Sequence, residues 1–183
     1  QVDTAPDDRP QVGTVDINIP EVANKCYALV PESYNATLEY GLIIWLHAPG
    51  EFDKEALEEL WQPICDAHEL ILLAPQPADS SRWSPTDLEF IRKTIDAVSD
   101  RYAIDLTRVV VHGYLAGGAM AYYTAVMNRE VCRGIAPGAA PLPGRVGLPV
   151  TEPVQPLAIY SSSFSGAKTS EQIATGEKQL QEQ

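Results

Sequence analysis

The sequence predicts an α/β protein in which a mostly parallel sheet carries helices on both faces. Two continuous apolar runs, YGLIIWLHA (40–48) and LILLAPQ (70–76), have the pattern of strands buried on both faces. They alternate with two segments of helical apolar spacing, DKEALEELWQPICDAHE (53–69) and SPTDLEFIRKTIDAVSDRY (84–102). Strands that alternate with helices of ten or more residues form parallel sheets, because each crossover helix must pack on one sheet face.

The N-terminal part of the chain predicts a linker followed by two strands. Residues 1–12 are rich in Pro and Asp, which is typical of a linker, so we expect the folded domain to span residues 13–183. The runs TVDINIP (14–20) and NKCYALVPES (24–33) follow as strands that proline ends. The abrupt start leads us to expect a module cut from a longer chain.

The two central helices carry distinct end signals. In the first, Pro63 is expected to kink or break the helix because proline removes a backbone donor. In the second, Ser84 is the predicted cap, with Pro85 at the first position and Asp87 three residues on. Its apolar stripe consists of Leu88, Ile91, Ile95, Val98 and Tyr102.

The C-terminal half continues the same alternation. The sequence predicts a strand over 107–113, a helix over 117–128, and two strands over 133–140 and 156–163. A last helix is expected from residue 169, with Thr169 and Gln172 as its capping pair.

Charge and composition argue against two classes of partner. The net charge is −12 and the sequence pI is about 4.5, so phosphate backbones and anionic lipid are repelled. No apolar run reaches the roughly 20 residues of a membrane span. We therefore expect neither nucleic acid nor membrane as a partner. The three cysteines have no metal-site or redox spacing, and we expect buried free thiols.

One motif resembles a known catalytic turn. The stretch RVVVHGYLAGGAMA (108–121) is similar to the nucleophile elbow of the α/β-hydrolase superfamily, whose pattern is G-x-S-x-G. The order and spacing of the elements from residue 13 onward are most similar to secreted esterases of the polyhydroxybutyrate-depolymerase-like branch. The resemblance implies an α/β-hydrolase fold that lacks its final strand within this sequence.

The resemblance also implies that the catalytic residues are missing. Leu115 occupies the apex at which these enzymes present a serine hydroxyl. Their acid and histidine follow the elbow, whereas His47, His68 and His112 all precede it here. No carboxylate lies between residues 152 and 171. Because Leu115 keeps the steric cost of a strained apex, we expect that the turn has relaxed or is dictated by packing.

The remaining site predictions also follow from the resemblance. The expected oxyanion donors are the N–H groups of Ala116 and Ala48, although Pro49 beside Ala48 has no N–H to offer. A ligand pocket is expected to be lined by Tyr114, Leu115, Trp83 and His47.

Other polar residues are interpreted as structural. We expect His47 to brace its loop and His112 to be packed, and we expect the serines at 161–163 to cap a loop. No histidine or carboxylate spacing indicates a metal site, and no glycine-rich loop indicates a phosphate-binding cofactor, so we expect no metal and no cofactor.

The sequence therefore predicts a degenerate hydrolase-like domain that works as a binding or accessory module. Its expected partners are a small apolar ligand or a covalently linked neighbouring domain, and the resemblance to secreted enzymes favours an extracytoplasmic location. The alternative is an active esterase or peptidase-associated hydrolase that uses a nonstandard nucleophile, or a base outside this sequence.

Overall fold

The computed structural model describes residues 10–20, 22–50, 52–144, 146, 156–163 and 170–181. The elements are β1 (Gly13–Asp16), β2 (Cys26–Val30), β3 (Tyr40–Leu46), α1 (Lys54–His68), β4 (Leu70–Pro75), α2 (Asp87–Arg101), β5 (Ile104–Tyr114), α3 (Ala116–Met127), β6 (Gly134–Gly138), β7 (Ala158–Ile159) and α4 (Ser170–Gln181). Most of the predicted linker, and Thr169 of the predicted capping pair, lie outside the described residues.

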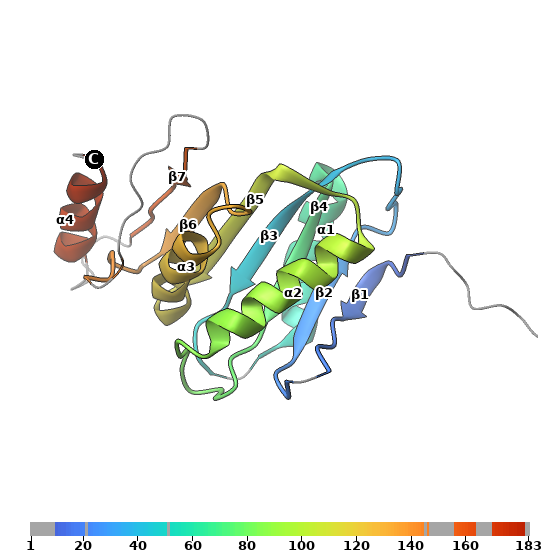
Figure 1. Cartoon of the computed structure of the whole chain (residues 1–183), viewed down its shortest axis with the longest axis horizontal. Helices are drawn as coiled ribbons and strands as arrows, with labels where there is room; N and C mark the ends of the chain where they lie inside the picture. Colours follow the sequence, from blue (N-terminus) through green and yellow to red (C-terminus); the bar gives the residue numbers. More distant parts are fainter. Residues whose placement is uncertain are drawn as a thin grey trace, which may run out of the picture.

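The strands form one sheet of order β1-β2-β4-β3-β5-β6-β7 (Figure 1). The pairs β1–β2 and β2–β4 are antiparallel, and the pairs from β4 to β7 are parallel. The central strands carry the apolar runs, and four residues of β4 in succession are fully buried. The predicted fold class is therefore confirmed, with an antiparallel portion at the N-terminal edge.

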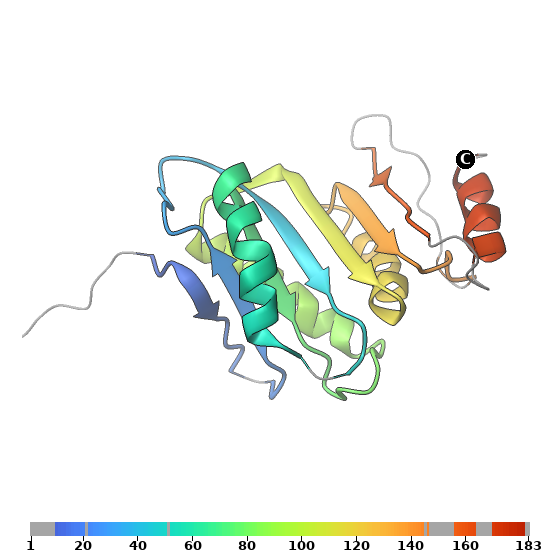
Figure 2. The same cartoon turned by 180° about the vertical axis from the view of Figure 1, so that it is seen from behind.

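Helices cover both faces of this sheet. Helix α1 packs on β2 and β4 on one face (Figure 2), whereas α2 packs on β4 and α3 on β5 and β6 on the other (Figure 1). Helix α4 lies at the end of the molecule where β7 ends the sheet (Figure 1). Aliphatic and aromatic side chains of the sheet, α2 and α3 form the larger of two buried clusters, and α1 closes the smaller one.

Several elements differ from the sequence prediction in their extent. Helix α2 begins at Asp87 with Thr86 at its N-cap position, two residues after the predicted start at Pro85, and the contact of Ser84 with Asp87 lies in the turn before it. Helix α1 continues through Pro63, and both Pro63 and Glu59, the residue whose carbonyl loses its donor, are exposed on the helix surface. Strand β5 starts three residues earlier than predicted, at Ile104. A register irregularity where β5 meets Tyr40 and Leu42 accommodates its polar start. Strand β7 is only two residues long, although Ser162 still forms an isolated bridge with Gly138.

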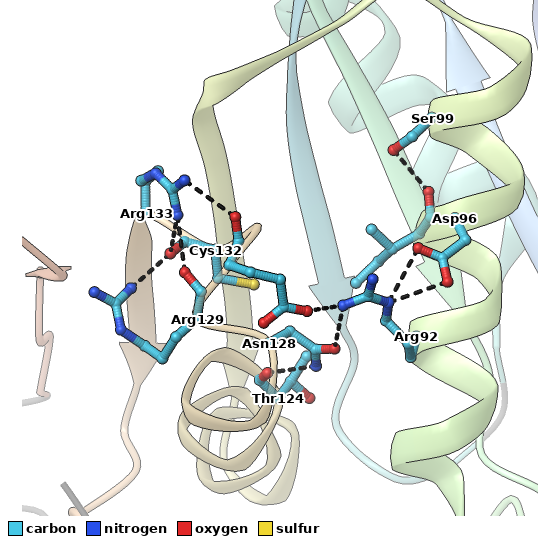
Figure 3. Close-up of polar contacts among 10 residues, drawn as sticks. Arg92, Asp96, Ser99, Thr124, Asn128, Arg129, Cys132 and Arg133 are labelled. Carbon is cyan, nitrogen blue, oxygen red and sulfur yellow. Dashed lines mark hydrogen bonds and ion pairs between the residues drawn. The ribbon is translucent and has the colours of Figure 1, made fainter. Parts of the chain in front are cut away.

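Arginine side chains hold the turn between α3 and β6 (Figure 3). Arg129 donates to the Cys132 carbonyl at 2.7 Å, and Arg133 donates to the Arg129 carbonyl at 2.9 Å. Arg92 of α2 reaches Glu130 and the side-chain oxygen of Asn128, which ties α2 to this turn. Cations at a helix C-terminus also favour the helix dipole. The turn thereby fixes where β6 begins.

The described cysteines are free and buried, as expected from their spacing. Burial raises the pKa of the Cys65 thiol to about 11 and that of Cys132 to about 12, and it raises the pKa of Cys26 further. These thiols are therefore neutral at physiological pH and pack as small apolar groups.

Candidate functional site

The candidate site lies where the strand order reverses. Strand β3 leads to β4 on one side, and β5 pairs with β3 on the other, so the loops after β3 and β5 diverge from adjacent carboxyl ends. Ligand crevices in open α/β sheets form at this kind of switch point. The residues that diverge here are His47 onward, after β3, and the turn at Leu115, between β5 and α3.

Leu115 keeps the strained backbone of a sharp strand-to-helix turn. Its φ is 53° and its ψ is −117°, a combination of backbone angles that residues other than glycine rarely adopt. Its N–H donates to the Gly138 carbonyl at 2.9 Å, and its own carbonyl accepts from Ala119 N–H at 3.0 Å. Of the two outcomes considered from the sequence, the turn has therefore not relaxed.

The surrounding packing explains why the turn persists. A Cβ on Gly117 would lie 2.0 Å from the Leu46 carbonyl oxygen, and one on Gly113 would lie 2.2 Å from the Gly117 carbonyl oxygen. Backbone atoms of β3, β5 and α3 thus approach one another too closely for any side chain. Because the residues on both sides of the turn are held in this way, the backbone at Leu115 keeps its strained conformation.

The side chain at the apex offers no chemistry. Leu115 is 47 % exposed, and its neighbours Tyr114 and Ala116 are exposed as well, so the tip of the turn projects toward solvent. An isobutyl group has neither a proton to lose nor a lone pair to donate. No nucleophile stands at the point where the backbone would present one.

His47 braces the loop that follows β3. Its Nδ1–H donates to the Ala48 carbonyl at 2.6 Å, and the Trp83 indole donates to the His47 carbonyl at 2.9 Å. Burial lowers the pKa of His47, so the ring is neutral and its proton is held on Nδ1. Its Nε2 is buried and has no hydrogen-bond partner in the described part of the chain. The ring therefore cannot take a proton from the exposed apex.

The two expected oxyanion donors differ in their surroundings. Ala116 is the first residue of α3, so its N–H has no partner within the helix, and the residue is exposed. Ala48 is followed by Pro49, which has no N–H. Gly50 cannot substitute, because its N–H already donates to the Ser80 carbonyl at 2.9 Å. Of the two positions, Ala116 is therefore the one whose N–H lies at a helix start without a partner in that helix.

The structure divides the expected pocket into two cavities. Trp83 and Ala116 line a cavity of about 470 Å³ beside α2 and α3, together with Leu88, Met120 and Tyr123. His47, Ala48 and Tyr114 line another of about 410 Å³ beside α1, together with Trp45, Phe52 and Trp61. Leu115 is in neither lining. The two linings share no residue.

Two of the positions considered for an alternative nucleophile or base make structural hydrogen bonds, whereas the Ser161 hydroxyl is buried without a partner in the described part of the chain. Ser162 continues the pairing with β6, because its N–H donates to the Pro137 carbonyl and its carbonyl accepts from Ala139. His112 donates from Nδ1 to the Ala136 carbonyl at 2.7 Å, and its ring lies 6.0 Å from that of Trp61 on α1. Within the described residues no histidine pairs with a carboxylate, and no cluster of three metal-ligating side chains occurs.

Asp87 positions this region, and sequence reasoning gave it only a capping role. It is 2 % exposed, and its carboxylate accepts from the Asn24 amide, from Ala78 N–H and from Ser84 N–H, at 3.2, 3.0 and 2.8 Å. The Ser84 bond is the backward half of the predicted capping box. The bonds to Asn24 and Ala78 have no local sequence signal. Together they fix the loop that carries Trp83 against His47.

Comparison with solved structures identifies the architecture. A thermostable esterase superposes with a TM-score of 0.60 at 18 % identity, covering 91 % of this chain and 60 % of its own. The chain has the α/β-hydrolase fold. An S-formylglutathione hydrolase from Staphylococcus aureus superposes with a TM-score of 0.68 at 12 % identity, over 94 % of this chain and 86 % of that one.

The comparisons reach no further than the fold. An acetyl xylan esterase from Aspergillus awamori gives a TM-score of 0.61 at 16 % identity, over 72 % of this chain and 53 % of the esterase. The chain thus spans little more than half the length of two of these esterases. No family model matches the sequence, and no curated protein matches it. None of the described helices has the length and apolar character to cross a bilayer.

Proposed function

We propose that this domain is a hydrolase-like binding module without hydrolytic activity. The observation that carries the proposal is the apex of the elbow, where the strained backbone is intact and the side chain is that of Leu115. In the G-x-S-x-G pattern this position is the nucleophile. The turn that would present a nucleophilic hydroxyl is in place, and the side chain at its apex has no hydroxyl.

The expected loss of rate is large. Removing the serine of such a catalytic unit costs on the order of a millionfold in turnover. Binding and a partial oxyanion hole leave at most roughly 10³ to 10⁴ over the uncatalysed reaction. With Ala116 as one exposed donor and His47 buried and neutral, the residual rate falls toward the lower end of that range.

The ligand proposed for the module is small and apolar. The cavity beside α2 and α3 is lined by Trp83, Leu88, Met120 and Tyr123, and about 470 Å³ lies within the range of small-molecule sites. Ala116 is among its lining residues, and its N–H has no partner within α3. We propose an apolar ligand with a single hydrogen-bond acceptor that faces this N–H.

The context proposed for the module is a larger, extracytoplasmic protein in which it is covalently linked to a neighbouring domain. Its support is the Pro- and Asp-rich composition of residues 1–12, which is typical of a linker.

A covalent probe tests the absence of catalysis. The protein is incubated with a fluorophosphonate and analysed by mass spectrometry, in parallel with p-nitrophenyl acetate hydrolysis, with an active esterase of the same fold as the positive control. We expect no adduct and no turnover above buffer. An adduct on Tyr114 or on a serine at 161–163 would instead establish the alternative, an active hydrolase with a nonstandard nucleophile.

A neutral fluorescent probe tests ligand binding. Nile red is expected to bind in the α2–α3 cavity, and Ala119→Phe, which fills that cavity, is expected to weaken binding about tenfold. Ala67→Phe is the matched control, because Ala67 is exposed on α1 and lines neither cavity at the elbow. Equal affinity of the two variants would place the probe elsewhere and contradict the proposed site.

A further inference from the structure

A third cavity adjoins the cavity beside α1, with which it shares His47 and Phe52, and has no lining residue in common with the cavity beside α2 and α3. It has a volume of about 580 Å³ and opens between the loop after β3 and the loop after β4. Its lining combines basic, polar and aromatic side chains: Lys25, Tyr27, His47, Phe52, Lys54, Gln76, Pro77, Ser80 and Ser81, with Gly50. It therefore sits at the carboxyl ends of two parallel strands, where ligands bind in this kind of sheet.

The charge of this cavity is opposite to that of the chain. The sequence has five lysines and a net charge of −12, yet two of the lysines, Lys25 and Lys54, line this one cavity. No carboxylate is among its described lining residues. The nearest described carboxylates are engaged elsewhere, since Asp53 caps α1 through Ala56 N–H and Asp79 binds Ser81 and Arg82.

Lys54 is held by an aromatic contact, and Lys25 is held through its backbone. Lys54 Nζ lies 4.8 Å from the centre of the Tyr27 ring, and Tyr27 stacks on Phe52 with ring centres 5.5 Å apart. Lys25 is anchored through its backbone, because its carbonyl accepts from Gln76 N–H at 2.8 Å. Within the described part of the chain, neither ammonium makes an ion pair. Two like charges that share a cavity favour an anion between them.

The wall of the cavity is fixed by the same loops. Gly50 N–H donates to the Ser80 carbonyl at 2.9 Å, which joins the β3 loop to the β4 loop directly beside the cavity. The Gln76 amide and the Ser80 hydroxyl add neutral polar groups to the two ammonium groups. Phe52 and Pro77 supply the apolar part of the lining.

We propose that this cavity binds a small organic anion, with its carboxylate or phosphate oxygens at Lys25 and Lys54 and its apolar part against Phe52 and Pro77. The proposal does not depend on the absence of catalysis. An esterase assay that detected turnover would leave it unchanged, and failure of anion binding would leave the proposed function unchanged.

Four probes separate charge from apolar contact. Benzoate and phenyl phosphate carry a ring, whereas acetate and inorganic phosphate do not, and each is titrated up to about 10 mM while amide shifts are recorded by NMR. We expect both ring-bearing anions to shift Gly50, Ser80 and Ser81, and to bind at least fivefold more tightly than their ringless counterparts. Whichever ring-bearing anion binds more tightly identifies the preferred charged group.

Charge-removal variants test the two lysines. Lys25→Met and Lys54→Met are each expected to weaken binding about tenfold and to reduce its salt dependence. Lys93→Met is the matched control, because Lys93 forms a surface ion pair with Glu89 on α2, away from the cavity. The proposal is overturned if none of the four probes shifts these amides, or if Lys93→Met weakens binding as much as Lys54→Met. Circular dichroism of each variant shows whether it is folded.

Discussion

Replacing Asp87 by asparagine removes charge and hydrogen-bond acceptors from a buried position without changing its shape. One carboxylate oxygen accepts from the Asn24 amide and Ala78 N–H, and the other from Ser84 N–H and the Ser84 hydroxyl. An amide retains one acceptor oxygen, so two of these four bonds are lost. Hydrogen bonds to a charged group contribute about 1.5–3 kcal/mol each, which gives a loss of about 3–6 kcal/mol.

Urea unfolding measures this loss. Because Asp87 is 2 % exposed, water cannot replace the missing acceptor, and the loss is a large share of the 5–15 kcal/mol typical of a domain. Tryptophan fluorescence, to which Trp45, Trp61 and Trp83 all contribute, follows the unfolding. Asp100→Asn is the control, since Asp100 is exposed on α2 and makes no hydrogen bond or ion pair with the described residues, and its unfolding midpoint is expected to stay almost unchanged. A loss below about 1 kcal/mol for Asp87→Asn would refute the reasoning.

Three further predictions concern the elbow, His47 and the thiols. Leu115→Gly is expected to be about 1 kcal/mol more stable than Leu115→Ala in urea unfolding, because φ is positive at this residue; the reverse order would contradict the strained turn. Burial lowers the pKa of His47 in the folded state, so its contribution to stability is present above pH 6.5 and is lost as the pH falls through the lowered pKa. The wild type should therefore lose more stability between about pH 7 and 5 than a His47→Gln variant, and parallel losses would count against a buried neutral ring. The native thiols should not react with Ellman's reagent near pH 8, because burial raises the pKa of Cys65 to about 11 and of Cys132 to about 12, whereas rapid reaction before unfolding would show that they are accessible.

The parts of the fold that depend on local pattern could be predicted from the sequence. Apolar runs in the sequence indicate the buried strands. Gly113 and Gly117 indicate the turn, because the backbone atoms near them leave no room for a side chain. The position of Leu115 at the apex follows from the same spacing. Pro63 shows the limit of local rules, because its effect depends on whether water reaches the carbonyl one turn earlier.

The parts that depend on distant contacts could not be predicted in this way. The expected single pocket is two cavities, with Trp83 in one lining and His47 in the other, and the bond that joins these two residues spans 36 positions of the chain. The contact of Asp87 with Asn24 spans 63 residues and has no periodic signal. The basic cavity also requires the antiparallel pairing that brings Lys25 beside Gln76, and a sheet order cannot be read from one strand at a time.

The retained turn at Leu115 has a consequence for folding kinetics. Its geometry is held by Leu46 of β3 and by Gly138 of β6, which lie 69 residues before and 23 residues after it. The strained conformation can form only once these three segments have assembled, so it belongs to the last steps on the folding route. Substitutions at Leu115 should therefore change the unfolding rate and leave the refolding rate almost constant in a chevron plot.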